Sequence, residues 1–122
     1  MPRDGAYEIP AKYDLFIGNE WVAPSSVDVM ENRSPLTDEV ICTVPDANEV
    51  DVAKAVMAAN AAWRGWFELG SRKRANLLLQ VADRLVAEAE RFAWLETTDT
   101  GKPWRESVAN VHTAADRLRY YA

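Results

Sequence analysis

The stretch ICTVPDANEVDVAKAVMAANAAW, residues 41–63, marks the point at which the hydrophobic pattern of the chain changes. Before Pro45, apolar and polar residues alternate, which is typical of strands, and after it apolar residues recur about every 3.6 positions, which is typical of helices. Asn48 is a predicted N-cap for a helix from Glu49 to about Trp63. The sequence therefore predicts strands up to residue 45 and helices after it.

A first β-hairpin is predicted near the start of the chain. The short apolar runs 14–17 and 20–22 are separated by Gly18 and Asn19, two residues that tolerate positive φ. Residues 1–12 ahead of this hairpin contain two prolines, a glycine and mixed charge. We expect them to form an N-terminal tail.

A second hairpin is predicted from two alternating runs, residues 27–30 and 39–44. The stretch SPLTD, residues 34–38, supplies its turn, because proline fixes φ and aspartate hydrogen-bonds back to the backbone. The two hairpins together occupy residues 13–45.

The first predicted helix is apolar nearly all the way round, since most of its residues are alanine or valine. Such a helix is buried on more than one side. The other predicted segments are a modest covering for it. We therefore expect parts of its packing surface to belong to chain that is missing here.

Further helices complete an α+β order of two β-hairpins followed by three to four helices over residues 48–122. Ser71 is a predicted N-cap for a helix to about Glu88. The helical pattern then resumes and stops at Gly101, because glycine just past a helix end is a common stop signal. A last helix is expected from about Arg105, and it reaches the final residues without a cap.

Composition and charge exclude several classes of protein. The chain of 122 residues is 48% hydrophobic and 27% charged, which is typical of a globular domain. Its net charge is −5, and neither half is basic enough to support nucleic-acid binding. The chain has no apolar run of 18 residues, so we expect no membrane insertion. It has a single cysteine, which fits a reducing compartment, and we expect a cytoplasmic location.

Few residues could perform chemistry. Cys42 lies in an alternating strand and His112 on the last helix, so we interpret them as a small buried residue and a surface or boundary residue. A zinc site with several thiolate or imidazole ligands is impossible with one of each. Lys102 follows a glycine, but no glycine-rich loop precedes it, so no phosphate cradle is predicted. The residues alone indicate no enzyme.

The stretch LETTDTGKPWRES, residues 95–107, strongly resembles the aldehyde dehydrogenase superfamily pattern of leucine-glutamate-threonine, aspartate, then glycine-lysine-proline. Further matches follow in the family's order, and they are FIGNEWV at 16–22, SPLTDEVICTVP at 34–45, DVAKAVMAANAAW at 51–63, RANLLLQVADRL at 74–85 and RYYA at 119–122. The chain thus resembles an N-terminal segment, incomplete over 13–122, of an NAD(P)-dependent aldehyde dehydrogenase. Among these enzymes it is most similar to bacterial acetaldehyde dehydrogenase-like members.

The resemblance implies a parent enzyme of several hundred residues with the larger α/β aldehyde dehydrogenase fold. Such an enzyme oxidises a small aldehyde to a carboxylic acid through a cysteine nucleophile and a glutamate base, with NAD or NADP accepting hydride. These catalytic and cofactor-binding residues all correspond to positions beyond 122, and Cys42 does not match the nucleophile's motif. The isolated chain is therefore expected to bind no cofactor and to lack catalysis. Its implied partners are the rest of the enzyme chain and further subunits of a homo-oligomer.

One ligand site is implied by the resemblance. Family members often hold K+ or Na+ with the aspartate that corresponds to Asp99 and with main-chain oxygens that correspond to Asn32 and Arg33, and oxygen donors suit such hard cations. The other interpretation is that Asp99 is a helix-end or turn residue. Asp38 stands where the family usually has glycine, so the backbone of this turn either differs or takes positive φ at Asp38.

Two functions remain open from the sequence. The chain is a scaffold segment of an aldehyde dehydrogenase, or it is a free-standing helical interaction module without catalysis. The uncapped last helix and the apolar first helix favour the first reading. In that case the isolated chain should expose apolar patches.

Overall fold

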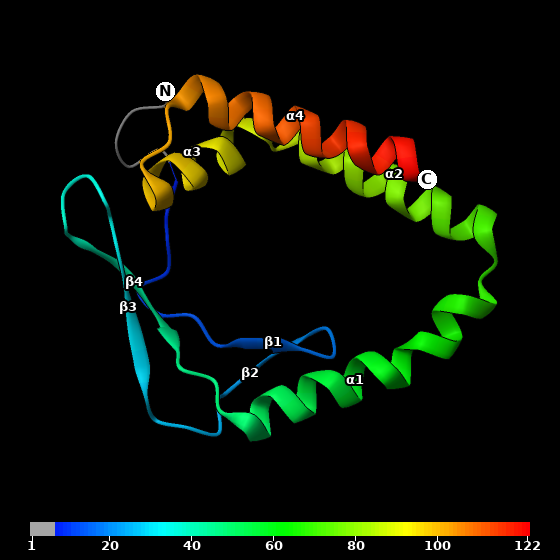
Figure 1. Ribbon diagram of the computed structural model, residues 1–122, viewed down its shortest axis with the longest axis horizontal. Coiled ribbons are helices and arrows are strands. Elements are labelled where there is room, and N and C mark those ends of the chain that lie inside the picture. Colours follow the sequence, from blue (N-terminus) through cyan, green and yellow to red (C-terminus); the bar gives the residue numbers. More distant parts are fainter. Residues whose placement is uncertain (1–6) are drawn as a thin grey trace. The chain divides into compact units, whose positions relative to one another are not determined.

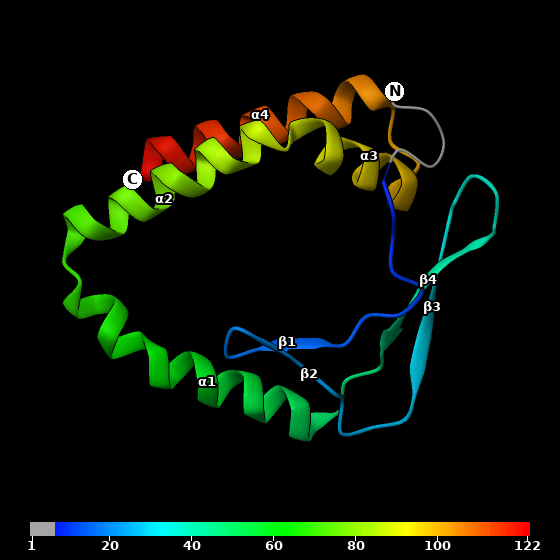
Figure 2. The ribbon, with the colours of Figure 1, turned by 180° about the vertical axis from the view of Figure 1, so that it is seen from behind.

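The computed structural model describes residues 7–122, and over them two small antiparallel sheets are followed by four helices (Figures 1 and 2). The predicted order of two β-hairpins and then helices is confirmed. The chain divides into two compact units. The hairpin unit comprises residues 9–33 and 38–68, and the helical unit comprises the other described residues, chiefly 69–122.

The first hairpin forms as predicted. Strand β1, Leu15–Ile17, pairs antiparallel with β2, Glu20–Val22. The two loop residues Gly18 and Asn19 have φ of 64° and 70°. Positive φ at both loop positions matches the right-handed twist of the flanking strands, which is why these two residue types stand here.

The second hairpin pairs β3, Val29–Arg33, with β4, Val40–Pro45. Strand β3 begins two residues later than predicted, because the Asp28 main-chain N–H donates to the Ser26 hydroxyl at 3.0 Å and forms a local turn. Asp38 has a φ of 59°. Positive φ is one of the two ways in which aspartate can replace the usual glycine, and it is the one adopted.

Residues 11–13 lie beside β4. The Tyr13 main-chain N–H donates to the Thr43 carbonyl at 3.0 Å, and the Thr43 N–H donates to the Ala11 carbonyl at 2.9 Å. The predicted tail thus includes residues with main-chain pairing, while its residues 1–6 lie outside the described part of the chain.

Helix α1, Glu49–Glu68, completes the hairpin unit. The predicted N-cap is confirmed, because the Asn48 side-chain oxygen accepts hydrogen bonds from two main-chain N–H groups of the first turn at 3.0 and 3.2 Å. The predicted end near Trp63 is wrong, since α1 continues for another five residues. In that extra turn the Arg64 guanidinium pairs with the Glu68 carboxylate at 2.9 Å, a favourable i,i+4 spacing.

The helical unit contains α2, Ser71–Ala87, α3, Ala89–Thr100, and α4, Trp104–Tyr121. Helices α2 and α4 lie side by side in both views of the ribbon (Figures 1 and 2), in agreement with their extensive contacts. Glu88, with φ −104° and ψ 17°, separates α2 from α3. This break accounts for the predicted interruption of the helical pattern.

One helix start differs from its prediction. Ser71 is already in the first turn of α2, and Gly70 occupies the N-cap position without a side-chain hydrogen bond. The prediction of Ser71 as N-cap is therefore wrong by one residue. The predicted stop at Gly101 is confirmed, because Gly101 has a left-handed φ of 72° and its N–H donates to the Thr97 carbonyl at 3.0 Å.

The core of the helical unit is built from small residues. Ala89, Ala93 and Val111 are buried together, and three partly buried residues pack against them: Leu85, Trp104 and Val108. Beside this core the Thr97 and Ser107 hydroxyls, both buried, share a hydrogen bond of 3.0 Å that joins α3 to α4. Small side chains let the helices approach closely, and the hydroxyl pair satisfies two buried polar groups.

Candidate functional site

Asn32 and Arg33, the two predicted main-chain cation ligands, are consecutive residues at the end of β3. The register between β3 and β4 shifts between them, because Asn32 is opposite Cys42 whereas Arg33 is opposite Val40. Ile41 is therefore left without an opposite residue. A bulge of this kind disrupts the ladder locally and redirects main-chain groups, so these two residues stand at the irregular point of the hairpin.

The charge of Arg33 is engaged within the same hairpin. Its Nη2 lies 2.6 Å from the Glu31 carboxylate, and its Nη1 donates to the Asp38 carbonyl at 2.8 Å. The guanidinium thus has an acidic partner and a carbonyl acceptor. This pairing reduces the repulsion that a cation bound near the Arg33 main chain would otherwise meet.

Asp99, the predicted carboxylate ligand, lies in the last turn of α3 and is exposed. The carbonyl end of a helix carries a partial negative charge that favours cations. Asp99 belongs to the helical unit, whereas Asn32 and Arg33 belong to the hairpin unit. The cation site from these three residues stays a prediction.

An ion pair that was not predicted lies at the end of α3. The Lys102 ammonium contacts the Glu96 carboxylate, and both side chains are partly buried. The Thr100 hydroxyl donates to the Glu96 carbonyl at 2.6 Å, and the Lys102 main-chain N–H donates to the Thr100 hydroxyl at 3.3 Å. The usable signal was a glutamate and a lysine on either side of a helix-stopping glycine. Lys102 thus has a structural role next to Gly101.

Cys42 and His112 occupy the environments that were predicted for them. Cys42 is 5% exposed in β4, and the nearest polar contact given for its sulfur is the Asn32 amide at 3.9 Å. His112 is exposed on α4, in the other unit. A nucleophilic thiol needs a base within hydrogen-bond reach, and this contact supplies an amide instead.

Asp51 is the one buried carboxylate of α1 and was not singled out from the sequence. It is 2% exposed, and both of its oxygens accept the Ser25 main-chain N–H at 3.0 Å. Lys54 bridges the same two residues, because its ammonium lies 2.6 Å from the Ser25 hydroxyl and 3.4 Å from the Asp51 carboxylate. This cluster ties the first turn of α1 to the loop after β2. No local sequence pattern predicts this cluster, since Ser25 and Asp51 are 26 residues apart.

The Asp51 cluster predicts a pH dependence of stability. The pKa of Asp51 is lowered, and hydrogen bonding with the Ser25 side chain is the largest cause. Burial opposes this shift by raising the pKa. Hydrogen bonds with the Ser25 main chain, the Lys54 side chain and the Asn48 main chain lower it further. Since the folded pKa lies below the unfolded one, the stabilisation is fully present above about pH 4 and is lost as the pH falls through the folded pKa.

We expect Asp51→Asn to lower the urea midpoint of unfolding at pH 7, because the charged acceptor for Ser25 is lost. The difference from the wild type should shrink below about pH 4. Asp46→Asn, at an exposed carboxylate nearby, is the control and should change the midpoint little. A difference for Asp51→Asn that stays constant from pH 7 to pH 2 would contradict the assignment.

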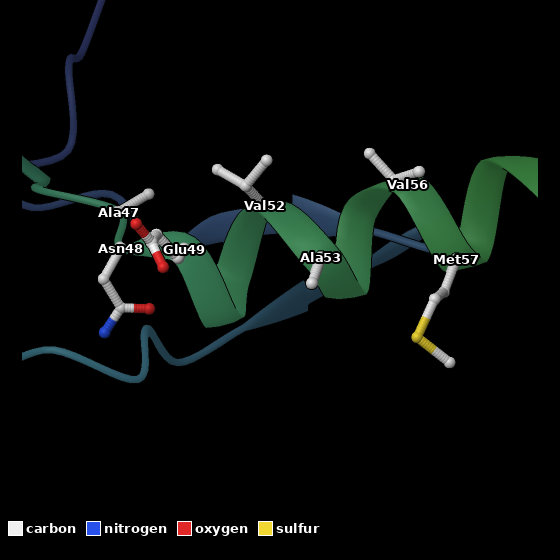
Figure 3. A pocket seen from close by; sticks show the side chains of 7 residues that line it. All are labelled: Ala47, Asn48, Glu49, Val52, Ala53, Val56 and Met57. Atoms are coloured by element: carbon white, nitrogen blue, oxygen red, sulfur yellow. The ribbon is translucent and has the colours of Figure 1, made fainter.

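Helix α1 exposes most of its surface. Among its twenty residues only Asp51 is buried, although the helix carries several large apolar side chains. Around its first turns lies a shallow, mainly apolar hollow (Figure 3). It is lined by Ala47, Asn48, Glu49, Val52, Ala53, Val56 and Met57. The predicted exposure of apolar patches is thus confirmed for α1.

Over residues 7–122, the histidine, cysteine, aspartate and glutamate side chains form no group of three or more that could hold a metal ion. No helix in this range is long and apolar enough to cross a membrane.

Most of the described chain resembles known proteins. Residues 21–122 match the aldehyde dehydrogenase family. The chain belongs to this family. Among curated aldehyde dehydrogenases, aldehyde dehydrogenase B of Escherichia coli is 38% identical over 98% of this chain, and an aldehyde dehydrogenase of Paracoccus denitrificans is 40% identical over all of it. The chain spans about a quarter of these relatives, namely 24% and 26% of their lengths.

Solved aldehyde dehydrogenase structures contain the same fold. The NAD-dependent aldehyde dehydrogenase of Sinorhizobium meliloti matches with a TM-score of 0.85 and 30% identity, over 93% of this chain and 23% of that one. A structure of PnpE in complex with nicotinamide adenine dinucleotide matches with a TM-score of 0.86 and 34% identity, over 88% of this chain and 22% of that one. In these enzymes the matched part is the N-terminal portion of an α/β fold.

Proposed function

We propose that this chain is the N-terminal scaffold segment of an enzyme that oxidises an aldehyde to a carboxylic acid. The observation that carries the proposal is the family match over residues 21–122 together with the shared fold. In the reaction, an aldehyde and water yield the acid, a hydride passes to NAD or NADP, and a proton is released. The cofactor choice is supported by the NAD-dependent and NAD-bound solved relatives.

The proposed role of the segment is structural and not catalytic. Its one cysteine is buried beside an amide and its one histidine is exposed in a different unit, so no nucleophile with an adjacent base is described. Nucleophile, base and nucleotide site belong to the three quarters of the enzyme that the chain does not span. We propose three partners: the rest of that polypeptide, a small aldehyde and further subunits of a homo-oligomer. We propose the cytoplasm as the location.

Activity is expected only when the segment is joined to a complete enzyme. A chimera in which residues 1–122 replace the matched part of the Escherichia coli relative should form NADH from NAD+ on addition of acetaldehyde, whereas the 122-residue chain should form none. The measurement is absorbance at the NADH band, with omission of aldehyde as control. Aldehyde-dependent NADH formation by the 122-residue chain alone would contradict the scaffold role. A folded but inactive chimera would instead favour the helical interaction module.

We also propose the K+ or Na+ site of Asp99 with the main-chain oxygens of Asn32 and Arg33. Support comes from the carboxylate at the carbonyl end of α3 and from the bulge at the two β3 residues. In the chimera, K+ should raise the melting temperature above that in a tetramethylammonium salt of equal concentration, and Asp99→Ala should abolish this difference. Glu90→Ala, at an exposed carboxylate of the same helix, should preserve it. An unchanged K+ effect in Asp99→Ala would remove Asp99 from the site.

A further inference from the structure

The last turn of α4 carries an arginine that bonds to two helices. The Arg119 Nη2 donates to the Asp83 carboxylate of α2 at 2.9 Å, and its Nη1 donates to the Asp116 carboxylate of α4 at 3.1 Å. A guanidinium presents several N–H groups in one rigid plane, so it can hold both carboxylates at once. We call these three residues the Arg119 clamp. In Figures 1 and 2 the end of α4 lies beside α2.

The clamp stands at the end of a packing row of α4. Ser107, Val111 and Ala115 recur every four residues along this helix, and all three are buried. Arg119 follows Ala115 after four more residues. Rows of this spacing form the ridges with which packed helices contact each other. On α2, Ala82 is fully buried just before the carboxylate that Arg119 reaches. Arg119 therefore continues the contact of small side chains between the helices as an ion pair.

Beyond the clamp, the side chains of α4 are exposed. Tyr120 and Tyr121 are 82% and 78% exposed, and their rings contact each other edge to face with centroids 5.0 Å apart. Over residues 7–122, Arg119 is the side chain nearest the end of α4 for which a bond to another helix is described. The path of the last turn of α4 relative to α2 thus depends on this bond.

The two carboxylates of the clamp have different effects. Their side chains are equally exposed, at 74% for Asp83 and 75% for Asp116. Asp116 is three residues before Arg119 on the same helix, so this pair stabilises α4 by itself. Asp83 belongs to α2, so only this pair fixes one helix to the other. The pKa of Arg119 is raised, chiefly by the hydrogen bond with Asp83; desolvation lowers the pKa, and Asp116 raises it further.

We propose that Arg119 is a positioning residue that, through Asp83, fixes the direction in which the enzyme chain leaves α4 and so aligns the NAD+-binding part that follows. The inference rests on the proposed function. In the solved relatives this fold is the N-terminal portion and makes up 23% of an NAD-dependent chain and 22% of an NAD-bound one. A loosened exit from α4 lowers the fraction of enzyme that is aligned, and the apparent affinity for NAD+ falls in proportion.

The experiment uses a second chimera, in which residues 1–122 replace the matched part of the NAD-dependent Sinorhizobium meliloti relative. Asp83→Ala breaks the bond between the helices. Asp116→Ala is the matched control, because it removes an equally exposed carboxylate from the same guanidinium but leaves the bond to α2. Asp83→Glu keeps a carboxylate at the cross-helix position. Arg119→Ala, alone and combined with Asp83→Ala, completes a double-mutant cycle.

Two quantities are measured, the dissociation constant of NAD+ by titration calorimetry and kcat at saturating NAD+. We expect Asp83→Ala and Arg119→Ala each to raise the dissociation constant about threefold, a size that fits an exposed ion pair, while kcat changes less than about twofold. The double variant should be no weaker than either single variant. Asp116→Ala should leave the dissociation constant unchanged, and Asp83→Glu should restore most of the affinity.

An unchanged dissociation constant in Asp83→Ala would overturn the proposal, even with a lowered melting temperature, because the clamp would then only stabilise the helices. Equal effects of Asp83→Ala and Asp116→Ala would overturn it as well, since they would place the cause within α4. Calorimetry does not require turnover, so a chimera that binds NAD+ but forms no NADH would contradict the proposed function alone. A chimera that binds no NAD+ would contradict both.

Discussion

Gly101→Val is expected to lower the free energy of unfolding of the helical unit by about 3 kcal/mol, the largest single-residue effect that we predict. Gly101 has a φ of 72°, a conformation that valine adopts only with strain. A β-carbon there would also lie 3.2 Å from the Pro35 ring and 3.6 Å from the Leu36 side chain, and valine adds two methyl groups beyond it. Urea unfolding followed by far-ultraviolet circular dichroism measures the loss.

Two other glycines separate the causes of this loss. Gly70 has a φ of 78° with a ψ of 157°, a region adopted almost only by glycine, and nothing lies within 4 Å of an added β-carbon, so Gly70→Val should show backbone strain without crowding, about 1–3 kcal/mol. Gly65 lies in α1 with open space around it, so Gly65→Ala should stabilise by about 0.5–1 kcal/mol. If Gly101→Val cost no more than the roughly 1–2 kcal/mol expected of left-handed backbone strain alone, the close approach of Pro35 and Leu36 would contribute nothing to the loss.

Ala115→Leu is the second large effect, with an expected loss of about 1–3 kcal/mol in the free energy of unfolding. Ala115 is fully buried on α4, in one row with Ser107 and Val111, which are also buried. Leucine adds three carbon atoms to a position from which solvent is already excluded. Alanine and leucine have similar helix propensities, so the loss reports packing and not helix formation.

The control for this substitution is Ala109→Leu, at an exposed position of the same helix. It should change the free energy of unfolding by no more than about 0.5 kcal/mol. The two variants have identical composition, and they are compared by their urea midpoints. Equal midpoints would mean that the Ala115 side of α4 is not tightly packed.

The stretch that carries the family resemblance has a structural explanation. Within residues 95–107, Gly101 ends α3 in a left-handed conformation, and Lys102 pairs with Glu96 across that end. Thr97 and Ser107 then share a buried hydrogen bond between α3 and α4. These residues build a sharp turn between two packed helices. The most recognisable motif of the segment therefore positions helices, which agrees with a scaffold role.

Features that depend on neighbours in the sequence were predicted well. Asn48 caps α1, Gly18 and Asn19 form the first turn, and Gly101 ends α3, because each of these outcomes depends on a few adjacent backbone angles and hydrogen bonds. The end of α1 was placed five residues early. The alanine-rich pattern stops at Trp63, but the helix continues because the next residues contain no proline and include a favourable ion pair that offsets Gly65.

The predicted cation ligands illustrate the limit of such reasoning for a site. The sequence placed Asp99 near a helix end and Asn32 and Arg33 beside the turn of the second hairpin, beyond the strand predicted at residues 27–30. The structure places Asp99 in the last turn of α3 and extends β3 through Arg33. The resemblance suggested that the three act together. The register shift beside Asn32 and the pairing of Arg33 with Glu31 follow from how β3 meets β4, which no local pattern encodes.

The sequence by itself determined the order of hairpins and helices and the family of the chain, because these follow from local periodicity and matched motifs. Only the tertiary structure decided that Asp51 is buried beside Ser25, that Thr97 contacts Ser107, and that large apolar side chains of α1 are exposed. The physical reason is that burial depends on contacts between residues distant in the chain. The sequence of an apolar helix is the same whether its side chains are buried by a partner or exposed.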